Sequence, residues 1–181
     1  MRKKSAVREA YLSLFKTRLG VGGVVATDRG LLEIFLPFGG ETVRTIRARF
    51  ASRYAGDLGE SPLTREAAEL LCRYFAGEGV TFRLPVDRSG FTPFQGEVYR
   101  AVEAIPFGEV RSYGEIAEKI GRSRAARGVG GAMAGNPLPI VIPCHRVVGA
   151  SGNLTGYSAE GGVESKKWLL DMERESTGKN E

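Results

Sequence analysis

The sequence predicts a mixed α+β protein, with a small N-terminal β-sheet and its helices followed by a helical C-terminal half. Two observations lead to this prediction. Short apolar runs between turn residues are typical of strands and occur in the first half, whereas helical spacing of apolar residues dominates the second. The change falls near residue 90, and 181 residues suffice for two small domains. We therefore expect an N-terminal α/β domain over residues 1–88 and a C-terminal domain over residues 89–181.

The first half contains five segments with regular patterning. Strands are indicated where apolar residues cluster between turns such as 27–30, and helices where apolar residues recur every three or four positions. Cys72 lies within the second helical pattern, which favours a buried and inert thiol. The expected elements are strands at Gly22–Ala26, Leu31–Phe35 and Phe82–Val86, and helices at Val43–Tyr54 and Thr64–Phe75.

Three short helices are expected in the second half. The first covers Phe94–Ile105, and the second covers Tyr113–Ile120 and is terminated by Gly121. The third covers Arg124–Ala134 and follows Ser123, a residue type that caps helix N-termini. Short helices separated by tight glycine-containing turns indicate a helix-turn-helix.

The third helix is unusually rich in small residues, with glycine at positions 128, 130 and 131. Each glycine inside a helix costs roughly 0.5–1 kcal/mol relative to alanine, so a compensating gain is needed. That gain is close backbone approach either to a neighbouring element or to nucleic acid, and the helix alone does not decide between them. Small residues cannot read base edges, so the second alternative implies a shallow fit with little sequence preference. Arg124 and Arg127 could then contact phosphates or enter the base stack.

Composition and charge narrow the class of protein without identifying it. The net charge of +5 and the pI of about 9.4 suit a nucleic-acid binder, but many unrelated proteins are equally basic. The longest apolar run, 31–38, is too short to cross a bilayer, and no signal peptide is recognisable, so we expect a cytoplasmic, nucleoid-associated protein. One histidine and two cysteines cannot build the usual zinc site or a disulfide framework, and we expect no metal and no cofactor.

The most informative segment is 136–148, which reads Asn-Pro-Leu-Pro-Ile-Val-Ile-Pro-Cys-His-Arg-Val-Val. Its prolines and β-branched residues predict a stiff extended strand that carries Cys144. A thiol with the ordinary pKa of about 8.5 needs a nearby base, and His145 is the only histidine. Adjacent side chains on a strand point to opposite faces, so a bridging water is the natural link between them. A cysteine peptidase is excluded because no distant histidine exists, while a buried cysteine beside a surface histidine remains an alternative.

The run Ile142–Val148 resembles the active-site signature of the O6-alkylguanine-DNA alkyltransferases. The resemblance is nearly continuous from residue 94 to residue 173, and in the N-terminal half it is limited to length and pattern. It implies a small β-sheet with helices, followed by a helix-turn-helix domain with an active-site cysteine strand. The further matching segments are Phe107–Val110, Ser112–Tyr113, Ala125–Arg127, Gly130–Met133, Gly135–Pro137, Gly156–Tyr157 and Trp168–Leu170 with Glu173.

The resemblance implies a single-turnover DNA repair protein that moves an alkyl group from O6 of guanine to Cys144. In the family's scheme His145 accepts the thiol proton through a water and Glu173 orients the imidazole. Tyr113 crowds the 3′ phosphate of the flipped nucleotide and helps protonate guanine at N3, and Asn136 is the hinge between the recognition helix and the cysteine strand. The implied partner is double-stranded DNA containing O6-alkylguanine, with O4-alkylthymine left open as a second substrate. A monomer without membrane contact is expected.

The resemblance also assigns residues that bind DNA and line the substrate pocket. Arg127 resembles the finger residue that fills the base stack when the damaged base is flipped out. The other implied DNA-binding residues are Ser123, Ala126, Gly128 and Gly130. The implied pocket residues are Met133, Val147, Tyr157, Ser158 and Lys166.

The sequence departs from the family pattern at two places. The pocket loop Gly156–Gly162 is two residues longer than the common spacing, which puts in question the role of Ser158 and the tolerance for bulky alkyl groups. Ala134 replaces a basic residue often found before the Gly-Asn pair, so we expect slightly weaker DNA binding. The rival function is that of the non-catalytic alkyltransferase-like lesion binders, which lack the cysteine that Cys144 supplies here. A helix-turn-helix regulator would need long polar side chains on its recognition helix.

Overall fold

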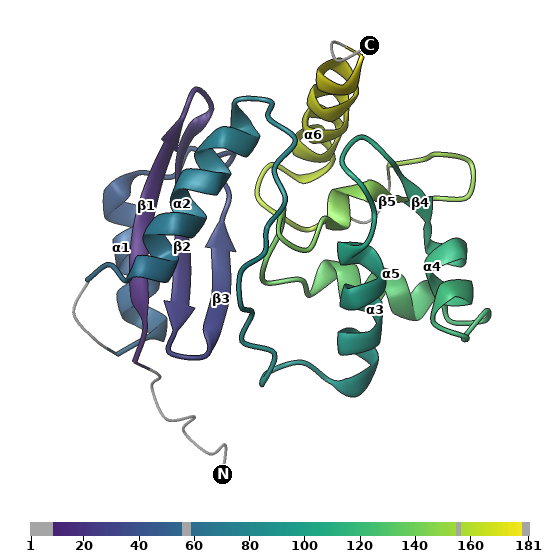
Figure 1. Ribbon diagram of the computed structural model, residues 1–181, viewed down its shortest axis with the longest axis horizontal. Helices are drawn as coiled ribbons and strands as arrows, with labels where there is room; N and C mark the ends of the chain where they lie inside the picture. Colours follow the sequence, from purple (N-terminus) through teal and green to yellow (C-terminus); the bar gives the residue numbers. More distant parts are fainter. Residues whose placement is uncertain (1–8, 56–58, 155–156, 179–181) are drawn as a thin grey trace.

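The computed structural model describes residues 9–55, 59–154 and 157–178, and its elements confirm the predicted α+β class. The N-terminal half contains an antiparallel sheet in which β2 (Gly20–Thr27) lies between β1 (Tyr11–Thr17) and β3 (Gly30–Phe35). Two helices follow, α1 (Val43–Arg53) and α2 (Pro62–Phe75). In Figure 1 the sheet and these helices form one lobe, and the remaining helices form a second lobe beside β3.

The two N-terminal helices cover opposite faces of the sheet, with α2 in front and α1 behind in the view of Figure 1. Helix α1 packs through its buried residues Ile46 and Phe50. On the other face, Ser13 Oγ of β1 donates a hydrogen bond of 2.9 Å to Thr64 Oγ1 of α2. Both faces of the sheet are therefore buried, and the strands do not show the simple alternation of a half-exposed sheet.

This burial explains the main difference from the predicted elements. Strand β1 is missing from the prediction because its apolar residues Leu12, Leu14 and Phe15 face both sides of the sheet. Helix α2 begins two residues earlier than predicted, since Ser61 caps it and Pro62 occupies its first turn. The other predicted elements of this sheet, β2 and β3, are confirmed.

The residues 82–86 do not form the predicted strand. They alternate between half-buried and exposed positions, which is the pattern of a strand, but they pair with β3 only at an isolated bridge between Leu31 and Val86. Leu31 N donates to Pro85 O at 2.8 Å, and Asp87 N donates to Leu31 O at 2.9 Å. Pro85 has no N–H to donate, so the ladder cannot continue past this bridge.

Cys72 is half-buried rather than buried, which corrects the interpretation of an enclosed thiol. It lies at the edge of the contact between α2 and the sheet, and its Sγ is 3.6 Å from the backbone oxygen of Lys16.

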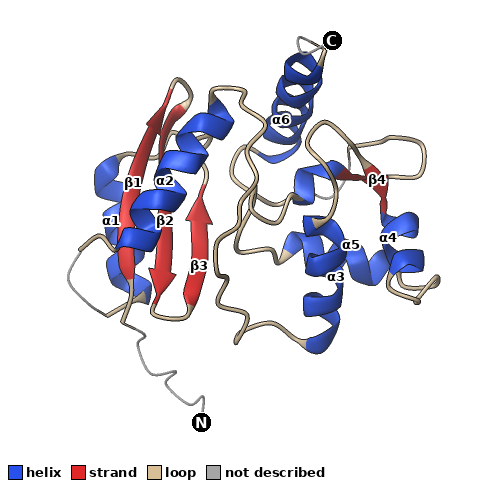
Figure 2. Ribbon diagram, viewed as in Figure 1, coloured by secondary structure: helices blue, strands red, loops and turns tan. Residues whose placement is uncertain are grey.

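The C-terminal half contains the three predicted helices, coloured blue on the right of Figure 2. Helices α4 and α5 pack against one another and against α3, as in a helix-turn-helix. Two short strands, β4 and β5, pair in parallel, and a long helix closes the chain. The elements are α3 (Pro93–Glu103), β4 (Arg111–Ser112), α4 (Tyr113–Lys119), α5 (Ala126–Ala134), a 3₁₀ turn η1 (Cys144–Arg146), β5 (Val147–Val148) and α6 (Gly162–Thr177).

Ser123 does not cap α5, contrary to the prediction. The N-cap is Ala125, and no side chain accepts a hydrogen bond there. Ala125 N instead donates to Arg122 O at 2.8 Å, so the residues before α5 form a separate tight turn. Ser123 lies exposed within that turn.

Cys144 does not lie on an extended strand, which corrects the prediction for the segment 136–148. Cys144 begins the 3₁₀ turn, and Ile142 N has already turned back to donate to Leu138 O at 2.8 Å. Ile140 adopts a φ of 75°, which an L-residue rarely does. The prolines at 137, 139 and 143 stiffen the segment as predicted, but they also remove the N–H groups that a strand ladder requires.

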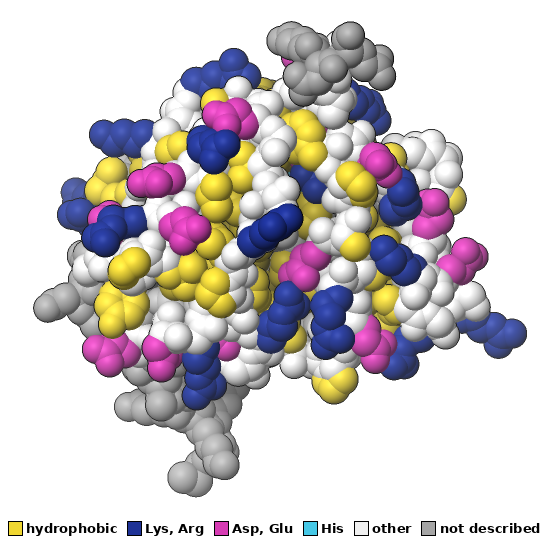
Figure 3. All heavy atoms as spheres, in the orientation of Figure 1, with side chains coloured by type: hydrophobic (Ala, Val, Ile, Leu, Met, Phe, Trp, Pro, Cys, Tyr) yellow, Lys and Arg dark blue, Asp and Glu magenta, His cyan; other side chains and the backbone are white. Residues whose placement is uncertain are grey.

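The two halves share one apolar core. Its largest cluster includes residues of the sheet and α2 together with residues of α3, α4, α5 and α6. Basic and acidic side chains are interspersed on the face drawn in Figure 3, and no histidine is visible there. Among the described residues, no helix is both long and apolar enough to cross a membrane.

Candidate active site

Cys144 lies at a cavity of about 480 Å³ formed between the two halves. Its side chain is 4 % exposed. A cavity of this size can enclose a flat heterocycle such as a nucleobase. The lining from the C-terminal half includes Met133, Asn136, Cys144, Tyr157 and Ser158, and the lining from the N-terminal half includes Glu33, Ile34, Arg49 and Arg53.

The residue after the cysteine, His145, is held in a buried polar network. Both His145 and Glu173 have no exposed surface, and His145 Nε2 lies 2.8 Å from Glu173 Oε1. The 3₁₀ turn brings the imidazole to the inner side of α6, where Glu173 is located. The predicted pairing of these two residues is therefore present in the structure.

Glu173 is an anion held by several donors. Arg146 Nε and Nη2 donate to it at 3.0 and 2.9 Å, and Gly108 N donates to Oε2 at 2.9 Å. Burial alone would raise the pKa of this carboxyl, but the hydrogen bonds from His145 and Arg146 and the positive charge of Arg146 outweigh it and lower the pKa to about 2. Arg146 supplies the positive charge of this network. His145 does not contribute one, because burial keeps its imidazole neutral.

The protonation of His145 follows from its surroundings. Burial lowers the pKa of the imidazole, and Glu173 only partly opposes this effect. Nε2 faces a carboxylate and so carries the proton of the neutral ring, an assignment that rests on the hydrogen-bond network. Nδ1 is then the basic nitrogen, and within the described residues it is buried and has no hydrogen-bond partner. Neutral His145 can accept a proton at Nδ1.

Cys144 is a neutral thiol at rest. Burial raises its pKa, while the side chains of Asn136 and Tyr157 and the charge of Lys166 favour the thiolate and reduce that effect. Asn136 also fixes the turn, because its Nδ2 donates to Ile142 O at 2.8 Å and its Oδ1 accepts from Leu138 N at 3.0 Å. The thiol therefore needs a proton acceptor before it can act as a nucleophile.

Lys166 and the rings of Tyr113 and Tyr157 form another group of side chains near Cys144. Lys166 is buried, its Nζ donates to Val147 O at 2.6 Å, and it lies 5.9 and 5.7 Å from the rings of Tyr113 and Tyr157. Burial raises the pKa of Tyr113, and the nearby Cys144 raises it further. Lys166 and Val147 are not among the residues that line the cavity, unlike the other three predicted pocket residues. The charge of Lys166 nevertheless favours the thiolate form of Cys144.

Relatives of known function match both the motif and the helical half of this chain. Residues 93–175 match the family model described as 6-O-methylguanine DNA methyltransferase, DNA binding domain. A methylated-DNA–protein-cysteine methyltransferase of Mycolicibacterium paratuberculosis is 56 % identical over 108 residues, which are 60 % of this chain and 64 % of the relative, just under two thirds. The constitutive enzyme of that name from Bacillus subtilis is 50 % identical over 115 residues, covering 64 % of this chain and 68 % of the relative. The chain belongs to the methylated-DNA–protein-cysteine methyltransferase family.

Solved methyltransferase structures extend the match over both halves. The O6-methylguanine methyltransferase of Mycobacterium tuberculosis superposes with a TM-score of 0.74 at 36 % identity, covering 92 % of this chain and 94 % of that one. A structure of the M. tuberculosis protein in complex with DNA gives the same values. The O6-methylguanine-DNA methyltransferase of Pyrococcus kodakaraensis gives 0.65 at 26 % identity, covering 91 % and 98 % of the two chains. The family resemblance inferred from Ile142–Val148 is thus confirmed.

The glycine-rich helix α5 is packed more closely at some positions along its length than at others. A Cβ on Gly128 would come within 3.1 Å of Phe94, so internal packing accounts for that glycine. A Cβ on Gly130 would make ordinary contact with Tyr113 at 3.9 Å, and one on Gly131 would meet nothing within 4 Å. Internal packing therefore leaves Gly131 unexplained.

Four of the five predicted DNA-binding residues lie within the first five positions of α5, and Ser123 precedes the helix. Arg127 and Gly128 are exposed, and Ala126 and Gly130 are half-buried. In the described part of the chain Arg127 is not among the ion pairs, which is the state expected of a residue that reaches toward another molecule. Ser158 Oγ donates to Ala134 O at 2.7 Å, which joins the pocket loop to the other end of the helix. Part of that longer loop, residues 155–156, lies outside the described residues.

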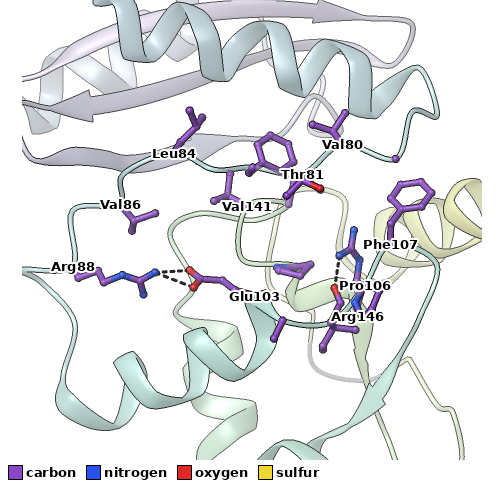
Figure 4. Close-up of a pocket in the computed structure, with 16 residues that line it drawn as sticks. Val80, Thr81, Leu84, Val86, Arg88, Glu103, Pro106, Phe107, Val141 and Arg146 are labelled. Carbon is purple, nitrogen blue, oxygen red and sulfur yellow. Dashed lines mark hydrogen bonds and ion pairs between the residues drawn. The ribbon is translucent and has the colours of Figure 1, made fainter.

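A second cavity, of about 320 Å³, lies behind the cysteine turn, and Cys144 is not among its lining residues. Figure 4 shows the Arg88–Glu103 ion pair at one end and Arg146 at the other, with Phe107 beside it. Arg146 Nη1 donates to Ile105 O at 2.7 Å, which fixes the guanidinium that holds Glu173. Of the polar network, only Arg146 lines this cavity; Cys144 and His145 do not.

Two residues of the network are absent from the prediction. Arg146 belongs to the recognised motif, and a buried carboxylate such as Glu173 calls for a cationic partner of this kind. Tyr74 of α2 is the second: its hydroxyl donates to Glu173 Oε1 at 2.6 Å and lies 3.1 Å from His145 Nε2. In the sequence Tyr74 fits the apolar face of a helix, and no local signal distinguishes it from an ordinary core aromatic.

Proposed function

We propose that this protein repairs DNA by transferring the alkyl group from O6 of guanine in a duplex to Sγ of its own Cys144. One observation carries the proposal: the thiol lies at a cavity beside a neutral histidine whose Nε2 is held by Glu173. That arrangement makes Nδ1 of His145 the acceptor of the thiol proton. The names of the family's members, which state a cysteine of the protein as acceptor, support the same chemistry.

The proposed reaction has two proton steps and one displacement. The thiol of Cys144 loses its proton to His145 Nδ1 through a bridging water, and the resulting imidazolium is stabilised by Glu173. The thiolate attacks the alkyl carbon, so that an S–C bond forms while the bond between that carbon and O6 breaks and its electrons stay on guanine. Guanine is reprotonated with the help of Tyr113. Overall, one proton moves from the thiol to guanine, and the thioether has no route back to a thiol.

The proposed role of α5 is to reach the base, which lies inside the duplex stack. A flipped nucleotide can enter the cavity that contains Cys144, at a cost of a few kcal/mol for unstacking. Arg127 would fill the space left in the stack, while Ala126, Gly128 and Gly130 lie against the minor groove. The hinge role of Asn136 fits this scheme, because its side chain links the end of α5 to the cysteine turn.

The remaining parts of the proposal concern the whole chain. Residues 89–181 would carry DNA binding and alkyl transfer, and residues 1–88 would support them through the apolar core that the two halves share. The protein would act as a monomer on duplex DNA, in the cytoplasm and with the nucleoid. Its net charge of +5 suits binding through phosphates that weakens with added salt.

The deciding experiment is mass spectrometry of the intact protein and its peptides after mixing with a duplex that contains one O6-methylguanine. We expect a gain of one methyl group per molecule, located on Cys144, that stops at one equivalent. The two cysteines provide matched variants: Cys72→Ser is expected to transfer normally, and Cys144→Ala is expected to bind the lesion without reacting. Methylation of the Cys144→Ala protein would contradict the assigned acceptor. Binding by the unaltered protein without any methyl gain would instead indicate a non-catalytic lesion binder.

A further inference from the structure

The N-terminal half contributes one polar side chain to the buried network, and we propose that this residue, Tyr74, is a positioning residue that sets the basicity of His145. It does so by sharing the Glu173 carboxylate with the imidazole. The inference rests on the proposed function, since it assigns His145 as the base. It gives the N-terminal half a direct part in the chemistry of the cysteine.

The three polar atoms form a closed triangle. Tyr74 Oη is 2.6 Å from Glu173 Oε1 and 3.1 Å from His145 Nε2, and the third side, from Nε2 to Oε1, is 2.8 Å. Two hydrogens are available inside the triangle, one on the hydroxyl and one on Nε2. Oε1 has no hydrogen of its own and accepts from both. Tyr74 and His145 therefore compete for the same carboxylate oxygen.

The surroundings make this competition strong. Tyr74 has no exposed surface, and its ring packs edge-on against Phe75 and Phe107. Hydrogen bonds in such an apolar environment are electrostatically stronger than in water, and a buried hydroxyl is costly unless it is paired. Burial raises the pKa of Tyr74 well above its ordinary value, and the neighbouring Glu173 raises it further, so the hydroxyl remains a donor at all relevant pH values.

The effect on His145 has a definite sign. The charged and titratable groups around the imidazole are Tyr74 from α2, Arg146 from its own turn, and Glu173 and Lys166 from α6. Only Glu173 stabilises the imidazolium. A hydrogen bond from Tyr74 to Oε1 reduces the negative charge that this oxygen offers to Nε2–H. Removing the hydroxyl should therefore raise the pKa of His145, and strengthening it as a donor should lower that pKa.

The test uses the fact that His145 is the only histidine in the chain. In protein labelled with ¹⁵N-histidine, one pair of ring signals reports both the tautomer and the titration. We expect Tyr74→Phe to move the titration midpoint of His145 upward by roughly half a pH unit or more. Site-specific replacement of Tyr74 by 3-fluorotyrosine, whose hydroxyl is a stronger donor, should move it downward. The second variant preserves the packing and the hydrogen bond, so it remains informative if the first one folds poorly.

A matched control removes the same kind of bond elsewhere. Tyr54 Oη donates to Glu33 Oε2 at 2.6 Å, and this pair lies outside the His145 network. Tyr54→Phe should leave the His145 midpoint unchanged. A purely structural role for Tyr74 would lower thermal stability in Tyr74→Phe while leaving the midpoint in place, and that result would overturn the proposal. So would shifts of the same sign in the two Tyr74 variants.

The rate of alkyl transfer gives an independent readout. With saturating O6-methylguanine duplex, the acid limb of the rate–pH profile should move upward in Tyr74→Phe by the same amount as the NMR midpoint. An NMR shift with an unmoved acid limb would show that His145 is tuned but is not the base. Absence of methyl transfer by the unaltered protein would remove the proposed function, and the NMR result would still decide the role of Tyr74.

Discussion

At the scale of single residues, the site combines groups whose charges are fixed by burial. Cys144 stays a thiol and His145 stays neutral because burial disfavours the charged form of each. Glu173 stays charged because Arg146 and the donors around it outweigh its burial. The thiol of Cys144 thus keeps its proton, and Nδ1 of His145 is free to accept a proton. This division explains how a weakly acidic cysteine can react at neutral pH.

The first prediction concerns Glu173 and acid stability. Its pKa is about 2 in the folded protein against an ordinary 4.5, so its contribution to stability is fully present above about pH 4.5 and is lost as the pH falls toward 2. Glu173→Gln leaves the buried Arg146 without its counter-charge and should cost about 3 kcal/mol at pH 7. Urea unfolding at pH 7 and at pH 3 measures this cost. The difference between the two proteins should shrink at the lower pH, and an equal difference at both would refute the pKa assignment.

At the scale of elements, local sequence predicts helices better than it predicts the chain around Cys144. Helices α3, α4 and α5 follow the 3.6-residue spacing of their apolar residues, and each was predicted with its ends within two residues. The prolines of 137–143 suggested an extended strand, but they remove the N–H groups that a strand would use, and the chain turns instead. The prolines that led to the prediction of a strand are therefore also the reason why no strand forms there.

The second prediction uses the contrast within α5. Gly131 is exposed and a Cβ there meets nothing, so Gly131→Ala should stabilise the protein by roughly 0.5–1 kcal/mol. If α5 lies against DNA, the same substitution should weaken duplex binding. Gly128→Ala is the comparison variant and should stabilise the protein less than Gly131→Ala, because its Cβ would press on Phe94 at 3.1 Å. Thermal unfolding and duplex binding measure the two effects; Gly131→Ala with full DNA affinity would exclude close approach at this position.

The third prediction concerns the exposed Arg127 on the same helix. Arg127→Ala should slow repair of O6-methylguanine in a duplex at least tenfold, because an unfilled base stack makes flipping more costly by a kcal/mol or more. Reaction with free O6-benzylguanine requires no flipping and should change by less than about twofold. Single-turnover rates on the two substrates measure the contrast. Lys119→Ala is a control that removes an exposed positive charge from α4. Equal losses on both substrates would exclude the flipping role of Arg127.

At the scale of the whole molecule, the sequence indicates two units where the structure shows a shared interior. The change of pattern near residue 90 is real, since strands of the sheet lie before it and the helix-turn-helix lies after it. Tyr74, however, reaches from α2 to Glu173 in α6, and the main apolar cluster includes residues of both halves. Contacts between residues 99 positions apart leave no periodic trace in a single sequence. The motif Ile142–Val148 therefore points to Cys144 and His145, but it carries no information about Tyr74 in the N-terminal half.

The fourth prediction follows from this shared interior. Trp168, the only tryptophan, packs against Phe38 and Phe75 of the N-terminal half with ring centroids 5.7 and 6.2 Å apart. Phe75→Ala should therefore cost about 3 kcal/mol and loosen both halves together. In urea, Trp168 fluorescence reports the contact between the halves and far-UV circular dichroism reports the helices of both. The two transitions should coincide in the original protein and shift together in the variant, since one core unfolds as one unit. Transitions that separate would mean that each half holds its fold without the other, and that the aromatic contact joins two independent domains.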